Sequence, residues 1–255
     1  MRDATPFILN RIYSKLRKLI SYPIYKRYLS KITISHPLHG IPTRLTADVS
    51  ADPTEFFDHY DAFAHWATKR IFAKGRRLKT LDVGSIKMMN GILSNIHDVT
   101  ALVLADCSDS LSQVNYVKHD IAEQLPFPAN SFDVFTSMVS LPIVGLARYG
   151  DKLDADCLMR FVVELGRVMK PDGELLISMC LGKNVLNFNN GWFFDMPTIE
   201  RIFDGWTVLD RLVDLKSSPY GANVSSPQRF TTDTSVANIR FGDYRVIFLH
   251  LRRQT

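Results

Sequence analysis

Leu78-Lys79-Thr80-Leu81-Asp82-Val83-Gly84-Ser85 is the stretch that decides the fold. It predicts a short buried strand that ends in a tight turn. Glycine at the turn lets the backbone pass close to a ligand, because no Cβ intrudes. An acid inside the strand and a glycine after it are typical of nucleotide-type cofactor sites, which makes Asp82, Gly84 and Ser85 candidate cofactor residues. A turn without a ligand is the alternative, since no second glycine follows two positions on.

The composition is that of a globular protein. The chain has 255 residues, of which 46% are hydrophobic and 22% charged, so it can bury a full core in one large domain with an appendage. Its three cysteines, Cys107, Cys157 and Cys180, have no metal-ligand or redox spacing. We expect them to be small buried residues in a reducing, cytoplasmic compartment, and we expect no metal site. No long apolar run begins the chain, so we expect neither a signal peptide nor a membrane span.

The positive charge is concentrated at the N-terminus. Residues 1–35 carry eight basic residues and one acidic residue, whereas the remainder holds 23 basic and 25 acidic residues. Residues 7–21 place apolar side chains on one helical face and basic ones on the other, which predicts a basic amphipathic extension and linker at 1–51 before a main domain at 52–255. The segment 7–32 suits an anionic membrane surface at the inner face of the membrane. The alternative is that it packs on its own domain or on a second copy in a homodimer.

From residue 78 onward, strand-like and helical patterns alternate. Alternation of this kind predicts an α/β fold with a mostly parallel sheet covered by helices on both faces. The clearest helix runs from about Asp154 to Met169, and Asp52-Pro53-Thr54-Glu55 has the sequence of a helix start. The expected strands are 79–83, 101–106, 114–117, 133–138, 174–180, 206–213 and 243–251.

Further polar residues follow the later strands. Asp106 stands 22 positions after Gly84, where a carboxylate can accept hydrogen bonds from a ribose diol. Asp120 and Ile121 follow the next strand and form a polar and apolar pair suited to the edge and face of an adenine. Ser137 closes the strand at 133–138. Because the carboxyl ends of parallel strands meet at one edge, these residues are candidates for the same site.

Together these features resemble the class I S-adenosylmethionine-dependent methyltransferase superfamily over residues 78–215. The resemblance implies a Rossmann-like fold with a seven-stranded, mostly parallel sheet and an antiparallel last strand, a place that residues 243–251 fit. It also implies S-adenosylmethionine as the cofactor. The residues that would bind it are Asp82, Gly84, Ser85, Asp106, Asp120, Ile121 and Ser137.

A closer resemblance joins the chain to the methyltransferase-like family called domain of unknown function 268. It rests on the run Gly145-Leu146-Ala147-Arg148-Tyr149-Gly150-Asp151 and on the later pair Phe188-Asn189. The family is similar to proteins found with bacterial surface-polysaccharide genes, which implies a sugar or glycan substrate. The sequence departs from the family pattern twice. Pro142-Ile143 replaces the usual Glu-His, and Gly191-Trp192 replaces the His-Arg of Phe-Asn-x-His-Arg.

The resemblance implies methyl transfer to a hydroxyl of that sugar or glycan. Transfer requires that the acceptor oxygen lose its proton, and Asp151 is the candidate base. Tyr149 and Arg148 would hold or polarise the acceptor. The alternative structural reading is a loop that caps the helix after Asp154.

A second function remains open. Because two histidines of the family pattern are missing, the chain is alternatively a catalytically inactive, methyltransferase-like binding or regulatory subunit of a glycan-synthesis complex. Asp106 and Asp120 favour the enzyme. Nucleic acid is not an expected partner, since the main domain carries no net basic charge and the sequence has no base-flipping segment.

Overall fold

The structure is a computed structural model of the 255-residue chain. It describes residues 58–107, 111–147, 149–187, 191–215, 229–237 and 243–254, and isolated residues 22, 23, 26 and 30. The chain divides into two units, Met1–Phe56 and Phe57–Thr255. Apart from those isolated residues, the predicted N-terminal helix, the linker and the helix start at Asp52 lie outside the described residues. Among the described residues, no helix has the length and apolar character needed to cross a membrane.

Helices and strands alternate through most of the second unit, as the sequence predicts. Asp58 caps the first described helix, where its carboxylate accepts hydrogen bonds from the backbone N–H groups of Tyr60 and Asp61. In chain order the elements are α2 (His59–Phe72), β1 (Lys79–Val83), α3 (Lys87–Ser94), β2 (Asp98–Val103), β3 (Asn115–Lys118), β4 (Phe132–Met138), the 3₁₀ helix η1 (Leu141–Ile143), α4 (Cys157–Val168), β5 (Met169–Gly182), β6 (Val185–Asn187), β7 (Gly191–Phe193), α5 (Met196–Ile202), β8 (Trp206–Asp214), β9 (Phe230–Thr231), η2 (Thr234–Ala237) and β10 (Tyr244–Arg253).

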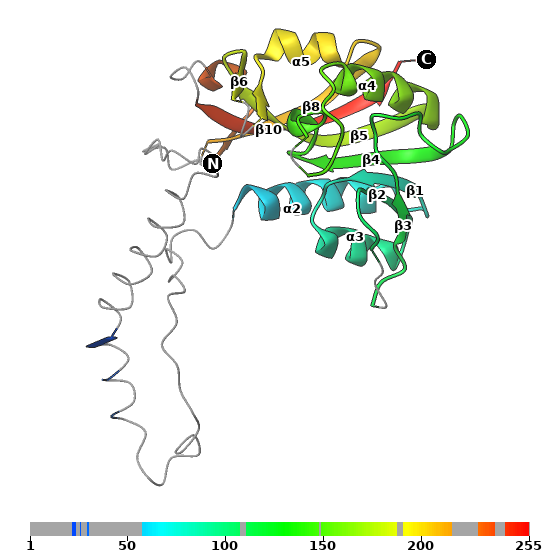
Figure 1. Ribbon diagram of the computed structural model, residues 1–255, viewed down its shortest axis with the longest axis horizontal. Helices are drawn as coiled ribbons and strands as arrows, with labels where there is room; N and C mark the ends of the chain where they lie inside the picture. The colour runs from blue at the N-terminus through cyan, green and yellow to red at the C-terminus, as the bar shows by residue number, and fades with distance from the viewer. Residues whose placement is uncertain are drawn as a thin grey trace, which may run out of the picture. The chain divides into compact units, whose positions relative to one another are not determined.

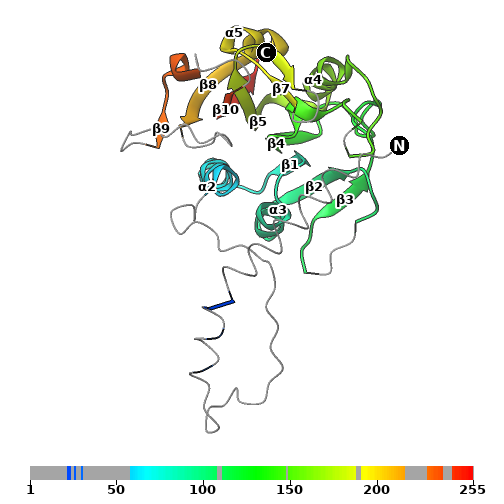
Figure 2. The same ribbon diagram turned by 60° about the vertical axis from the view of Figure 1, so that its left-hand side comes forward.

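One twisted sheet forms the centre of this unit (Figure 1). Its strand order is β3-β2-β1-β4-β5-β10-β8-β9. The pairs from β3 to β5 are parallel, whereas β10 runs antiparallel to both β5 and β8. Helices α2 and α3 cover one face, and α4 and α5 cover the other (Figure 2). This is the predicted mostly parallel sheet with an antiparallel last strand, and the two-residue β9 extends the expected seven strands.

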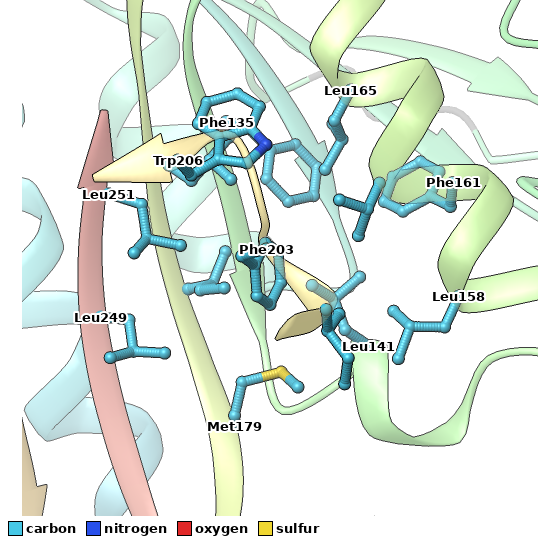
Figure 3. Packing of buried hydrophobic residues seen from close by; sticks show 14 of the residues in the cluster. Phe135, Leu141, Leu158, Phe161, Leu165, Met179, Phe203, Trp206, Leu249 and Leu251 are labelled. Carbon is cyan, nitrogen blue, oxygen red and sulfur yellow. The ribbon is translucent and has the colours of Figure 1, made fainter. Parts of the chain in front are cut away.

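Each face of the sheet buries its own core. On the α4 and α5 side, Phe161 of α4 packs on Phe135 of β4, and Leu165 and Leu249 of β10 belong to the same buried cluster (Figure 3). On the other face, α2 and α3 contribute a second cluster that is centred on Phe63. Because both faces are covered, the central strands are buried almost throughout, including the polar side chains of Thr80, Asp82 and Thr136.

Candidate functional site

A cavity of about 460 Å³ opens at the carboxyl ends of the parallel strands. Three predicted site regions line it, after β1, after β3 and in the loop before α4. The predicted residues that the structure brings together here are Gly84, Asp120, Ile121, Tyr149 and Asp151. In an open parallel sheet this edge is where ligands bind, because successive loops diverge there and leave a crevice.

Gly84 makes the turn out of β1. Its backbone has φ +76°, a conformation that favours glycine. The carbonyl oxygen of Gly84 accepts a hydrogen bond from the Ser140 hydroxyl at 3.1 Å, which fixes the turn after β1 to the loop after β4. A Cβ at position 84 would lie 2.0 Å from Ser140 Oγ. The glycine is therefore required both by the backbone angle and by this close contact.

Asp82 lies just below this turn and organises it from within the sheet. Its carboxylate is buried and accepts hydrogen bonds from the Thr136 hydroxyl at 2.6 Å, the Asn90 amide at 2.8 Å and the Ser85 backbone N–H at 3.2 Å. Burial raises the pKa of this carboxyl group above its usual value, against the opposing effect of these bonds. Neither Asp82 nor Ser85 lines the cavity, so the structure gives them a role in shaping the Gly84 turn.

Gly84→Ala should destabilise the fold by about 1–3 kcal/mol, because alanine adds left-handed strain and displaces Ser140. Gly75→Ala is the matched control, since Gly75 also has positive φ but a Cβ there would meet no heavy atom within 4 Å. Urea unfolding of both variants would measure the loss of stability that the contact with Ser140 causes in addition to the loss from backbone strain. Equal losses would contradict the close contact with Ser140.

Asp106 lies at a separate, smaller cavity of about 190 Å³, which shares the side chain of Val103 with the larger one. It forms an ion pair with Lys118 at 2.8 Å and its side chain is 87% exposed. Hydrogen bonding to that ammonium group lowers the pKa of Asp106. Strand β2 ends at Val103, three residues before the predicted position. The contact of Asp106 with a ribose remains a prediction.

The segment after β3 closes one side of the cavity. Asp120 accepts hydrogen bonds from the backbone N–H groups of Ala122 at 2.9 Å and Lys152 at 3.3 Å, so it ties this segment to the loop before α4. Ile121 and His119 line the wall beside it. The predicted pair of a carboxylate and an apolar side chain therefore faces the cavity. Ser137, by contrast, is fully buried within β4 and does not line it.

The loop after β4 holds a strained residue at the cavity. Val139 has φ +49°, which is unfavourable for a β-branched side chain, and it lines the cavity. Its backbone N–H donates to the Ser178 hydroxyl of β5 at 2.9 Å. This bond and the Ser140 bond to Gly84 hold the strained backbone in place, so the loop is fixed from both neighbouring strands.

Asp151 closes a turn at the mouth of the cavity. Its two carboxylate oxygens accept hydrogen bonds from the backbone N–H groups of Tyr149 at 3.0 Å and Ala147 at 3.2 Å. Each oxygen keeps a second lone pair that can accept a proton from a ligand. Tyr149 lines the cavity with a side chain that is 63% exposed, whereas Arg148 lies outside the described residues. Asp154 is bound to the Asp156 N–H and to Arg160 near the start of α4.

The two departures from the family pattern meet in space. Gly191 of β7 lies on η1, where a Cβ on Gly191 would stand 2.7 Å from Ile143 Cγ2 and 3.1 Å from the Pro142 carbonyl oxygen. Ile143 itself lines the cavity. An isoleucine and a glycine therefore stand together where the pattern has two histidines, and neither side chain can carry a proton.

Several cavity residues were not predicted from the sequence. Tyr60 reaches the cavity from the first turn of α2, and Met138 and Cys157 line it from β4 and α4. Burial raises the pKa of the Cys157 thiol to about 11 and that of Cys180 to about 12, so both are protonated near neutral pH. This confirms that they are buried apolar residues, whereas Cys107 is partly exposed.

The family comparison decides the membership of the chain. The profile described as "Caenorhabditis protein of unknown function, DUF268" matches residues 77–236. The chain belongs to the DUF268 family. The match begins two residues before β1 and ends within η2, so the residues that line the cavity lie within the DUF268 region apart from Tyr60. No curated protein matches the DUF268 chain by sequence.

Solved methyltransferases share the DUF268 fold. A 1,6-didemethyltoxoflavin-N1-methyltransferase from Burkholderia thailandensis has 16% identity and TM-score 0.52, covering 76% of this chain and 79% of its own. A structure provisionally named a sarcosine dimethylglycine methyltransferase, from Galdieria sulphuraria, has 13% identity and TM-score 0.54. The match covers 76% of this chain and 86% of that one. The N-methyltransferase NodS from Bradyrhizobium japonicum has 12% identity and TM-score 0.50, and the match covers 78% of this chain and 89% of NodS. At these identities the likeness establishes the class I methyltransferase fold.

Proposed function

We propose that this chain is an S-adenosylmethionine-dependent O-methyltransferase that acts on a sugar or glycan precursor. The observation that carries the proposal is the cavity, which gathers Gly84, Asp120, Ile121 and Asp151 at the carboxyl edge of the sheet. Two fold relatives, from Burkholderia thailandensis and Bradyrhizobium japonicum, were solved with S-adenosylhomocysteine. The sugar or glycan acceptor rests on the family resemblance.

The cavity has the chemistry that such a cofactor requires. The Gly84 turn brings backbone to its floor without a side chain, Asp120 offers a carboxylate, and Ile121 and Leu102 offer apolar walls for an adenine-sized ring. When bound, S-adenosylmethionine supplies an electrophilic methyl group. Asp151 stands at the mouth of the same cavity, where it can accept the proton of an acceptor hydroxyl, and Tyr149 can orient that acceptor.

Calorimetry of the full chain with S-adenosylmethionine and S-adenosylhomocysteine tests the proposal. Leu104→Arg places a cation on the cavity wall and should weaken binding by more than about tenfold. Leu209→Arg is the matched control, because Leu209 on β8 lies outside the cavity. The two leucines are similarly exposed, Leu104 to 37% and Leu209 to 41%. A wild-type chain that binds neither compound would overturn the cofactor assignment.

Asp106→Ala should weaken S-adenosylmethionine binding by about 1.5–3 kcal/mol, if the carboxylate turns from Lys118 to the ribose hydroxyls. Asp98→Ala is the control, because Asp98 begins the same strand and is also paired, with Arg77 at 2.7 Å. Both ion pairs are exposed, so neither variant should change the stability of the fold measurably. Unchanged affinity in Asp106→Ala would remove this residue from the site.

A second function is favoured by the contact between Ile143 and Gly191. Because this part of the cavity wall offers no proton acceptor, the chain would then be a catalytically inactive binding or regulatory subunit of a glycan-synthesis complex. Binding of S-adenosylmethionine without formation of S-adenosylhomocysteine, over a panel of nucleotide sugars and lipid-linked glycans, would favour this alternative. Product formation with any acceptor would favour the enzyme.

A further inference from the structure

Arg245 is a buried cation for which the described part of the chain provides no counter-ion. It lies in β10 and is 4% exposed. Its Nε and Nη1 atoms are buried without hydrogen-bond partners, and no ion pair joins it to another described residue. A guanidinium group stays protonated in proteins, so this position carries a full positive charge away from water. Such a charge is strongly unfavourable unless an anion reaches it.

The neighbouring strands do not supply that anion. Arg245 lies opposite Leu181 of β5 in the antiparallel register. The nearest buried acid along the sheet is Asp214, which pairs with Val246 and therefore points to the opposite face. Its carboxylate is already held by Arg229, at 3.0 and 2.7 Å. The segments 216–228 and 238–242, which flank β9 and β10 in sequence, contain neither aspartate nor glutamate.

The position of Arg245 relates it to the candidate site. Strand β4 ends at Met138, which pairs with Ser178 of β5 and lines the cavity. Leu181, the partner of Arg245, stands three residues further along β5, roughly 10 Å beyond the end of β4. Arg245 is therefore at the carboxyl edge of the sheet, two strands from β4.

We propose that Arg245 binds an oxyanion, a phosphate or a carboxylate, carried by the acceptor substrate. The guanidinium fork matches both groups with two parallel hydrogen bonds. An unpaired buried charge destabilises the fold, but it favours binding of an anion. The anion compensates the charge and so removes the free-energy cost of burying it. The inference extends the proposed function, because it restricts the sugar or glycan acceptor to an anionic one.

Thermal unfolding of the full chain tests the site with inorganic phosphate against chloride at equal ionic strength. Phosphate should raise the melting temperature of the wild type by about 5 °C and leave Arg245→Met unchanged. Without phosphate, Arg245→Met should be as stable as the wild type or more so, because it removes an unpaired charge. Arg229→Met is the control, since it removes the ion pair with the buried carboxylate of Asp214 and should be destabilised in both buffers.

Two results would overturn the proposal. Phosphate could stabilise Arg245→Met as much as the wild type, or Arg245→Met could lose as much stability in chloride as Arg229→Met. Arg245→Lys is an independent test, because it keeps the charge but loses the fork, and its phosphate affinity should fall about tenfold. Undiminished affinity in that variant would likewise contradict the site.

The source of the oxyanion is distinguished by three further ligands. A nucleotide sugar carries phosphate, glucuronate carries a carboxylate, and methyl glucoside is neutral. The first or second should stabilise the wild type through Arg245, whereas methyl glucoside should not. If an anion binds through Arg245 while S-adenosylmethionine does not bind, the anion site stands and the methyltransferase proposal fails. If only methyl glucoside binds, and does so equally in Arg245→Met, the anion site fails.

Discussion

Asp151→Asn should lower methyl transfer by about 10²–10⁴-fold while the affinity for S-adenosylmethionine stays within about threefold of the wild type. The carboxylate lines the cavity and is fixed by two backbone N–H groups, so it can take a proton without first being reoriented. Formation of S-adenosylhomocysteine, followed with the best acceptor of the panel, measures the loss.

Asparagine keeps one acceptor oxygen, so it loses one of the two hydrogen bonds that hold the loop. The unchanged affinity for S-adenosylmethionine reports on the geometry of the loop. Asp156→Asn controls for the loss of charge, because Asp156 is exposed at the start of α4 and makes no side-chain capping bond. Equal turnover by the wild type and Asp151→Asn would eliminate Asp151 as the base.

Glu174→Gln should lower the free energy of unfolding by about 3 kcal/mol at pH 7. Glu174 is 4% exposed in β5 and binds Lys74 at 2.7 Å, Arg252 at 2.9 Å and His250 at 2.9 Å. These partners overcome the effect of burial and lower its pKa from 4.5 to about 2. Glutamine cannot compensate the cations that remain, which is why the loss is large.

The sign of the pH dependence follows from that shift. Because the folded-state pKa lies below the unfolded value, the stabilisation is complete above about pH 4.5 and disappears as the pH falls to about 2. Urea unfolding at pH 7 and pH 3 should therefore show a smaller difference between wild type and Glu174→Gln at the lower pH. Glu123→Gln, which breaks an exposed pair with Lys152, should leave the free energy of unfolding nearly unchanged. A pH-independent difference would contradict the assignment.

Most of the sheet could be predicted because its strands are local patterns. The run 79–83 coincides with β1, and the predicted strand at 243–251 overlaps β10 closely. The loop residues Gly84, Asp120 and Asp151 could be predicted to share a site because parallel strands end at a common edge.

The residues that could not be placed depend on contacts far apart in sequence. Nothing near Asp82 shows that Thr136 and Asn90 bind its carboxylate inside the sheet. The sequence of α2 likewise does not reveal that Tyr60, in its first turn, lines the cavity. The missing counter-ion of Arg245 is also invisible in the sequence, since it follows from which face each neighbour on β5 and β8 uses.

The central position of β10 determines the order in which the chain can fold. This strand lies between β5 and β8, although it follows both in sequence, and its register joins residues 174–182 to residues 244–252. Until it inserts, β5 presents an open hydrogen-bonding edge of apolar residues, and β8 lacks its neighbour in the sheet. Such long-range pairing is slow, and an exposed edge favours association with other chains. We therefore expect refolding of the full chain to be prone to aggregation until β10 pairs with β5.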